Sequence, residues 1–65
     1  MEKAVYTYIK NGIPRTMYCN SLNHAMRIAA NHHENKEAIP DRIAYGGRAY
    51  SFMEILKYCQ ANKFI

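Results

Sequence analysis

The dipeptide Asn11-Gly12 constrains this chain more than any other local feature, because it joins two segments rich in β-formers. A type I′ turn needs positive φ at both central residues, and Asn-Gly adopts that conformation at little cost. Residues 4–10 and 13–19 are therefore expected to form a β-hairpin. Pro14 cannot donate to a ladder, so the second strand should lie at an edge or begin irregularly.

A two-residue turn also fixes which side chains share a face of the hairpin. One face carries three cross-strand pairs: Lys10 with Ile13, Tyr8 with Arg15, and Tyr6 with Met17. The opposite face carries Val5, Thr7, Ile9, Pro14, Thr16 and Tyr18. Neither face is wholly apolar, so the pattern leaves open which one packs on the rest of the protein.

The segment after this hairpin has the periodicity of an amphipathic helix that Asn20 or Ser21 can cap. Its apolar stripe recurs at helical spacing and ends at His33; it comprises Leu22, Ala25, Met26, Ala29, Ala30 and His33. Residues 35–41 are polar and contain Pro40, which predicts a connection.

A second hairpin and helix are predicted after this connection. Residues 42–45 and 48–50 read as short strands around Gly46-Gly47, with Tyr45 opposite Arg48 and Ile43 opposite Tyr50. Residues 51–54 fit a capping box, in which the Ser51 side chain accepts from the backbone N–H of Glu54 and the Glu54 side chain accepts from the backbone N–H of Ser51. Asn62 is expected to end this helix in the left-handed region.

The chain is therefore expected to be a small single-domain α+β protein, residues 1–65. Two β-hairpin–helix units, 4–34 and 38–63, give the order ββαββα. Their strands should form one antiparallel sheet with the helices packed on one face.

Residues 40–62 carry a Gly-Gly hairpin that runs through Tyr50-Ser51 into a helix. This stretch resembles a segment near the N-terminus of adenylate-forming enzymes, where a short hairpin also enters a helix through a Tyr-Ser/Thr pair. The nucleotide-binding motifs of that family are absent from the sequence. The resemblance thus implies a local hairpin and helix, and no activity.

The net charge of +4 is concentrated in the first half, where Glu2 is the only acidic residue before Glu34. A basic balance favours anionic partners. No apolar leader and no membrane-spanning run is found, so a cytoplasmic location without a membrane is expected. Cys19 and Cys59 are then expected to be reduced, buried thiols.

The sequence offers no set of residues suited to catalysis or to a metal. His24 and His32 would point about 80° apart on a helix and cannot converge on one ion. Cys19 and His24 lack a third group to orient them. We therefore expect no enzyme activity, no metal and no cofactor.

Two binding functions remain. The size favours a protein-binding module, such as a phage or mobile-element inhibitor or regulator that occupies the surface of a partner protein. The alternative is a small basic nucleic-acid-binding protein, because Tyr rings stack on bases and Arg binds phosphate. A homodimer is a further alternative. The candidate binding residues are Tyr8, Lys10, Arg15, Arg27, Tyr45, Arg48 and Tyr50.

Overall fold

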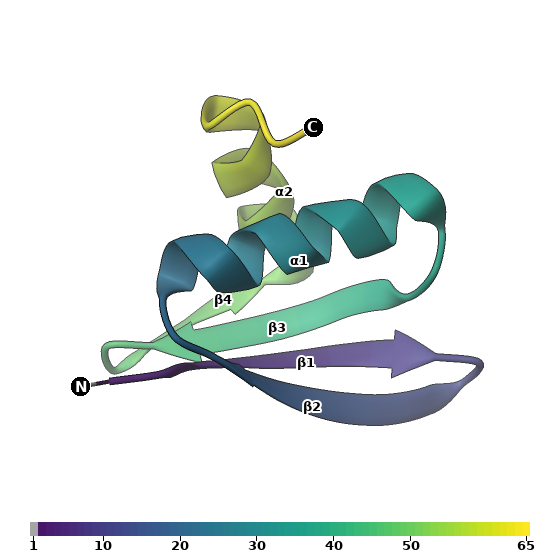
Figure 1. Cartoon of the computed structure of the whole chain (residues 1–65), viewed down its shortest axis with the longest axis horizontal. Helices are drawn as coiled ribbons and strands as arrows, with labels where there is room; N and C mark the ends of the chain where they lie inside the picture. Colours follow the sequence, from purple (N-terminus) through teal and green to yellow (C-terminus); the bar gives the residue numbers. More distant parts are fainter. Residues whose placement is uncertain (1) are drawn as a thin grey trace.

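A computed structural model describes residues 2–65 of the chain. The element order is β1 (Ala4–Lys10), β2 (Ile13–Cys19), α1 (Leu22–Asn35), β3 (Ile39–Tyr45), β4 (Arg48–Ser51) and α2 (Phe52–Ala61). The four strands form one antiparallel sheet in the order β2-β1-β3-β4. Both helices pack on the same side of this sheet (Figure 1), which confirms the expected α+β class and arrangement.

Both tight turns have the backbone that their sequences predict. Asn11 and Gly12 have φ values of 54° and 78°, and Gly46 and Gly47 have values of 61° and 74°. These positive values match the right-handed twist of the flanking strands. The registers follow, with Tyr8 opposite Arg15 in the first hairpin and Tyr45 opposite Arg48 in the second.

The core lies between the sheet and the helices and is centred on Tyr6, Met26, Ile43 and Ile55, all buried. Three alanines of α1, at positions 25, 29 and 30, are also buried, and their small side chains let this helix approach the sheet closely. Because Tyr6 is buried, the face of the first hairpin that carries Tyr6 and Tyr8 is the one that the helices cover. The face with Val5 and Tyr18 has no helix over it.

The helix starts follow their predicted caps. The Ser21 hydroxyl accepts a hydrogen bond from the backbone N–H of His24 at 3.0 Å. In α2, Ser51 Oγ accepts from the N–H of Glu54, and the Glu54 carboxylate accepts from the N–H of Ser51, which completes the capping box. Each helix thus begins where a short polar side chain satisfies its free donors.

The start of β3 and the conformation of Asn62 differ from the sequence-based expectation. β3 begins at Ile39 rather than at residue 42, because residues 39–40 pair with β1 through Ile9 and Tyr8. Pro40 is tolerated there because β4 pairs only with residues 42–45 and leaves the start of β3 without a neighbour on that side. Asn62 has φ of −100° and is not left-handed, so that expectation was wrong. The positive φ falls on Lys63, at 59°.

Candidate interaction surfaces

The first hairpin places Tyr8 in an aromatic cluster against α1. Its ring centroid lies 5.1 Å from that of Tyr6 and 4.8 Å from that of His32. The Tyr6 hydroxyl lies 2.9 Å from His32 Nδ1. Burial, and secondarily the nearby Tyr8, raises the pKa of Tyr6 well above its ordinary value. Tyr6 is therefore the donor, and Nδ1 accepts when the imidazole ring is neutral.

Lys10 and Arg15 extend from the same side of the hairpin as Tyr8, and both are exposed. Among residues 2–65, the ion pair within 4 Å is Arg48–Glu54, so neither of these two cations is held by a carboxylate of the described chain. The charged groups of these two predicted binding residues are therefore available to a partner.

The second hairpin uses its Tyr–Arg pairs internally. Tyr45 and Tyr50 are half-buried against the core. The Arg48 guanidinium lies 4.4 Å from the centre of the Tyr50 ring and 3.0 Å from the Glu54 carboxylate. The backbone N–H of Ser51, followed by the Arg48 side chain, lowers the pKa of Glu54. This cluster stabilises the entry into α2, and the Arg48 side chain remains 61% exposed.

Arg27 is also engaged within the molecule. Its guanidinium lies 4.7 Å from the centre of the Phe64 ring, and its Nε donates to Asn23 Oδ1 at 3.1 Å. The seven predicted residues therefore lie in three separate places. Tyr8, Lys10 and Arg15 lie on the first hairpin, and Tyr45, Arg48 and Tyr50 lie on the second. Arg27 lies where α1 packs against Phe64.

The helix-free face of the sheet is a surface that the candidate residues did not include. Tyr18 is 68% exposed there, and Ile39 is 61% exposed. The register places further apolar or uncharged side chains beside them, namely Val5, Thr7, Ile9, Thr16 and Ala44. The alternation of the first hairpin already separates this face from the other. It does not reveal which face the helices cover, and that choice depends on contacts distant in sequence.

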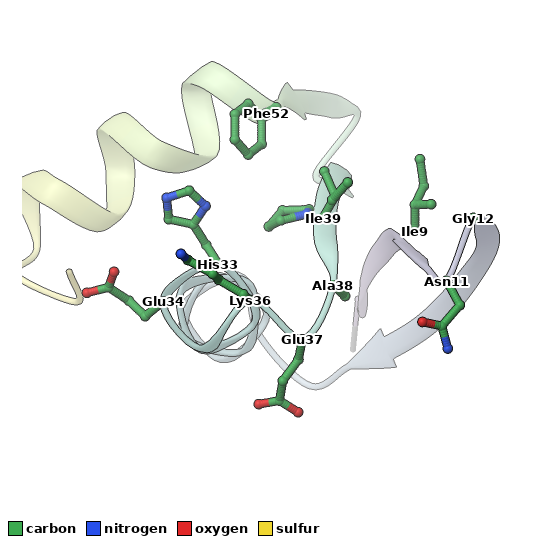
Figure 2. A pocket seen from close by; sticks show the side chains of 11 residues that line it. Ile9, Asn11, Gly12, His33, Glu34, Lys36, Glu37, Ala38, Ile39 and Phe52 are labelled. Carbon is green, nitrogen blue, oxygen red and sulfur yellow. The ribbon is translucent and has the colours of Figure 1, made fainter.

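A pocket of about 740 Å³ opens where the end of α1, the start of β3 and the start of α2 meet. His33 and Phe52 point toward each other across it, with ring centroids 5.9 Å apart, whereas Glu34 and Glu37 point away (Figure 2). Pro40 also lines it, as do Ile9 and Ile39 at the end of the helix-free face. None of the residues that line this pocket is a Ser, Thr or Cys; its polar side chains are those of Asn11, His33, Glu34, Lys36 and Glu37.

Cys19 and Cys59 are free and buried, as expected for small apolar side chains. Burial raises the pKa of both thiols. Cys59 Sγ donates to the backbone carbonyl of Met26 at 3.3 Å. Because the thiolate is the reactive form, both cysteines should react slowly. Within the described residues, no three His, Cys, Asp or Glu side chains lie together in a way that suits a metal ion.

Comparisons of the chain with protein-family models, with curated proteins and with solved structures gave no match. Between residues 2 and 65, neither helix has the length and apolar character needed to cross a membrane.

Proposed function

We propose that this chain is a non-enzymatic protein-binding module, an inhibitor or regulator that acts by occupying the surface of a partner protein. The observation that supports this proposal is the helix-free face of the sheet, where Tyr18 and Ile39 are largely exposed. Strands rise about 3.3 Å per residue and lie about 4.8 Å apart, so this face covers about 400 Å². Only part of this area is apolar, and exposed apolar side chains gathered on one face favour an interaction site.

The polar side chains around this face also suit a protein partner. Thr7 and Thr16 lie among the apolar residues, and Arg42 lies opposite Thr7 on β3. Protein interfaces combine an apolar centre with hydroxyl and guanidinium groups in this way. Tyr18 is the candidate anchor, because aromatic side chains contribute most to such interfaces.

The test is affinity capture from the cells that express the protein, comparing wild type with a double variant, Tyr18→Ser with Ile39→Ser. The matched control is Met53→Ser, because Met53 is also 61% exposed but lies on α2. We expect wild type and the control to retain the same partner and the double variant to lose it. Recovery of no protein above background, or equal recovery by all three, would contradict the proposal.

Nucleic-acid binding is a second candidate, supported by the absence of acidic residues from position 3 to position 33. Salt dependence separates the two functions, because phosphate contacts weaken steeply as salt rises. If nucleic acid is the partner, Arg15→Ala should weaken binding and flatten the salt slope. Arg48→Ala should do so less, since that side chain already contacts Glu54. An electrophoretic titration at low salt without a shift would remove this candidate.

A further inference from the structure

The outer edge of β2 carries backbone groups that no strand of this sheet covers. Lys10 and Ile13 flank a two-residue turn and so form a hydrogen-bonded pair, after which bonded and non-bonded pairs alternate. Pro14, Thr16 and Tyr18 therefore direct their backbone groups away from β1. The position of Pro14 agrees with this pattern, because proline has no N–H and a non-bonded position requires none.

This edge is suited to receive another strand. It presents the N–H groups of Thr16 and Tyr18 and the carbonyls of Pro14, Thr16 and Tyr18, alternating as an extended chain would need. Unpaired edges of this kind bind extended peptides through main-chain hydrogen bonds. The opposite edge, β4, has only four residues and runs directly into α2, so it offers a much shorter row of groups.

The surroundings of the β2 edge are positively charged. No Asp or Glu occurs between residues 3 and 33, which covers β1, β2 and all but the last turn of α1. Arg15 projects from β2 itself and Lys10 from the neighbouring strand, both exposed. Carboxylates brought alongside this edge would meet these two cations, and neither β1 nor β2 carries a like charge, which favours an acidic ligand.

The two sides of β2 differ in chemistry. Arg15 and Met17 lie on the side that faces the helices, whereas Pro14, Thr16 and Tyr18 lie on the helix-free side. Side chains of an added strand alternate between the same two sides. The ligand that fits best therefore places carboxylates beside Arg15 and apolar side chains beside Thr16 and Tyr18.

We propose that the outer edge of β2 binds an extended acidic segment of the partner protein, which joins the sheet as a fifth strand with alternating acidic and apolar residues. This inference rests on the proposed protein-binding function. A second copy of the chain fits less well, because two β2 edges would bring Arg15 residues together without a carboxylate. A nucleic acid would satisfy Arg15 but lacks the alternating backbone donors and acceptors that the edge requires.

The test uses the full chain, labelled with ¹⁵N, and a capped peptide of sequence Thr-Glu-Val-Glu-Val-Glu-Val-Thr as the probe. We expect the amide signals of Thr16 and Tyr18 to shift and to become protected from exchange, while those of β4 stay unchanged. A control peptide with Gln in place of Glu should bind roughly tenfold more weakly, and raising the salt concentration should narrow that difference.

Two substitutions at one position separate the backbone from the side chain. Thr16→Pro removes an outward N–H and no ladder hydrogen bond, so it should weaken peptide binding about fivefold while the fold is kept. Thr16→Val keeps the N–H and should bind within about twofold of wild type. Circular dichroism and melting confirm that both variants fold. Equal affinity of the two variants, with both folded, would overturn strand addition.

Other results would also overturn the inference. Equal binding of the Glu and Gln peptides would remove the acidic requirement. A dimer in sedimentation that Thr16→Pro dissociates would assign the edge to a second copy. Displacement of the peptide by single-stranded oligonucleotide, with shifts at the same amides, would assign it to nucleic acid.

Failure of this inference can be distinguished from failure of the proposed function. If a captured partner depends on Tyr18 and Ile39 but wild type binds neither peptide, the protein-binding function stands and strand addition is wrong. If the acidic peptide binds in the expected way but no cellular partner is captured, the chemistry of the edge stands and the proposed function is wrong.

Discussion

The two outer strands of the sheet have the same topological position but different surroundings. β2 has seven residues, and no acidic residue occurs in it or in its neighbour β1. β4 has four residues, and Arg48 at its start is engaged by Tyr50 and by Glu54. Short edges flanked by charged contacts resist pairing with other chains, whereas long edges with few charges permit it.

The comparison shows that similar hairpin–helix units can have different roles. In the second unit, the Tyr–Arg pair serves the start of α2 through the capping box. In the first unit, Tyr8 packs on His32, and Arg15 remains exposed. The Arg of the second hairpin thus contacts residues of its own unit, whereas the Arg of the first hairpin has no carboxylate partner among the described residues.

The largest expected effects concern the core of each unit. Tyr6 is buried in the central strand β1 and contacts α1, so Tyr6→Ala should lower the free energy of unfolding by about 3–5 kcal/mol. Ile55→Ala in α2 should cost about 2–3 kcal/mol, because a smaller side chain is lost. Urea denaturation measures both. A larger loss for Ile55→Ala would show that the second unit is the better anchored one, and Met53→Ala serves as the exposed control.

The local features of this fold were predictable from sequence. Asn11-Gly12 and Gly46-Gly47 specify turns through positive φ, and the two-residue loops then fix the pairing within each hairpin. Ser21 and Ser51 mark the helix starts because their side chains accept hydrogen bonds from the first turn. Each of these signals involves residues close in sequence, so no tertiary contact is needed to interpret them.

The remaining features depend on contacts distant in sequence. The start of β3 follows from pairing with β1, which places Pro40 opposite Tyr8. The choice of the covered face follows from the packing of Met26 and the alanines of α1 on Tyr6. The β2 edge becomes a candidate site only when the order β2-β1-β3-β4 is known, since that order decides which strands are outermost.

Proline substitutions distinguish the inner from the outer backbone groups of β2. Met17 pairs with Tyr6 at a hydrogen-bonded position, so Met17→Pro should remove a ladder bond and lower stability by about 1–3 kcal/mol. Thr16→Pro should change stability by less than about 1 kcal/mol, because its N–H points outward. Thermal melting measures both variants. Similar losses in the two variants would show that the assigned alternation is wrong.

The helix caps allow a direct comparison of the two units. Ser21→Ala removes one side-chain acceptor at α1 and should cost about 1 kcal/mol. Ser51→Ala should cost somewhat more, about 1–2 kcal/mol, because Ser51 belongs to a reciprocal capping box. Urea denaturation of each variant gives the difference. A smaller loss for Ser51→Ala would mean that the reciprocal bond adds nothing to the start of α2.

Alkaline pH should weaken the core around Tyr6. Burial raises the pKa of Tyr6, Cys19 and Cys59 above their ordinary values of 10.0, 9.0 and 9.0, so these groups ionise first in the unfolded chain. The stabilisation of the fold by these three protonated groups is complete below about pH 8 and is lost as pH rises above about 9.

The variant that tests this pH dependence is Tyr6→Phe. It should cost about 1 kcal/mol at pH 7, since the bond to His32 is lost, and it should reduce the decline between about pH 9 and 11. Melting temperatures across this range measure the effect. The control is Tyr18→Phe, which removes an exposed hydroxyl and should leave stability at pH 7 unchanged. If the melting temperature of Tyr6→Phe falls between about pH 9 and 11 as much as that of wild type, ionisation of Tyr6 does not cause the loss of stability.

The smallest expected effect concerns the helix ends, where the two units differ in backbone conformation. Lys36 ends α1 with φ of 56°, a conformation that costs a non-glycine residue energy. Lys36→Gly should therefore raise stability by about 0.5 kcal/mol, even after the added freedom of glycine in the unfolded chain. Asn62 ends α2 with φ of −100° and donates to the Tyr58 carbonyl at 2.9 Å. Asn62→Gly relieves no strain and should lower the free energy of unfolding. Urea denaturation measures both variants. A change in the same direction for both would contradict this difference between the helix ends.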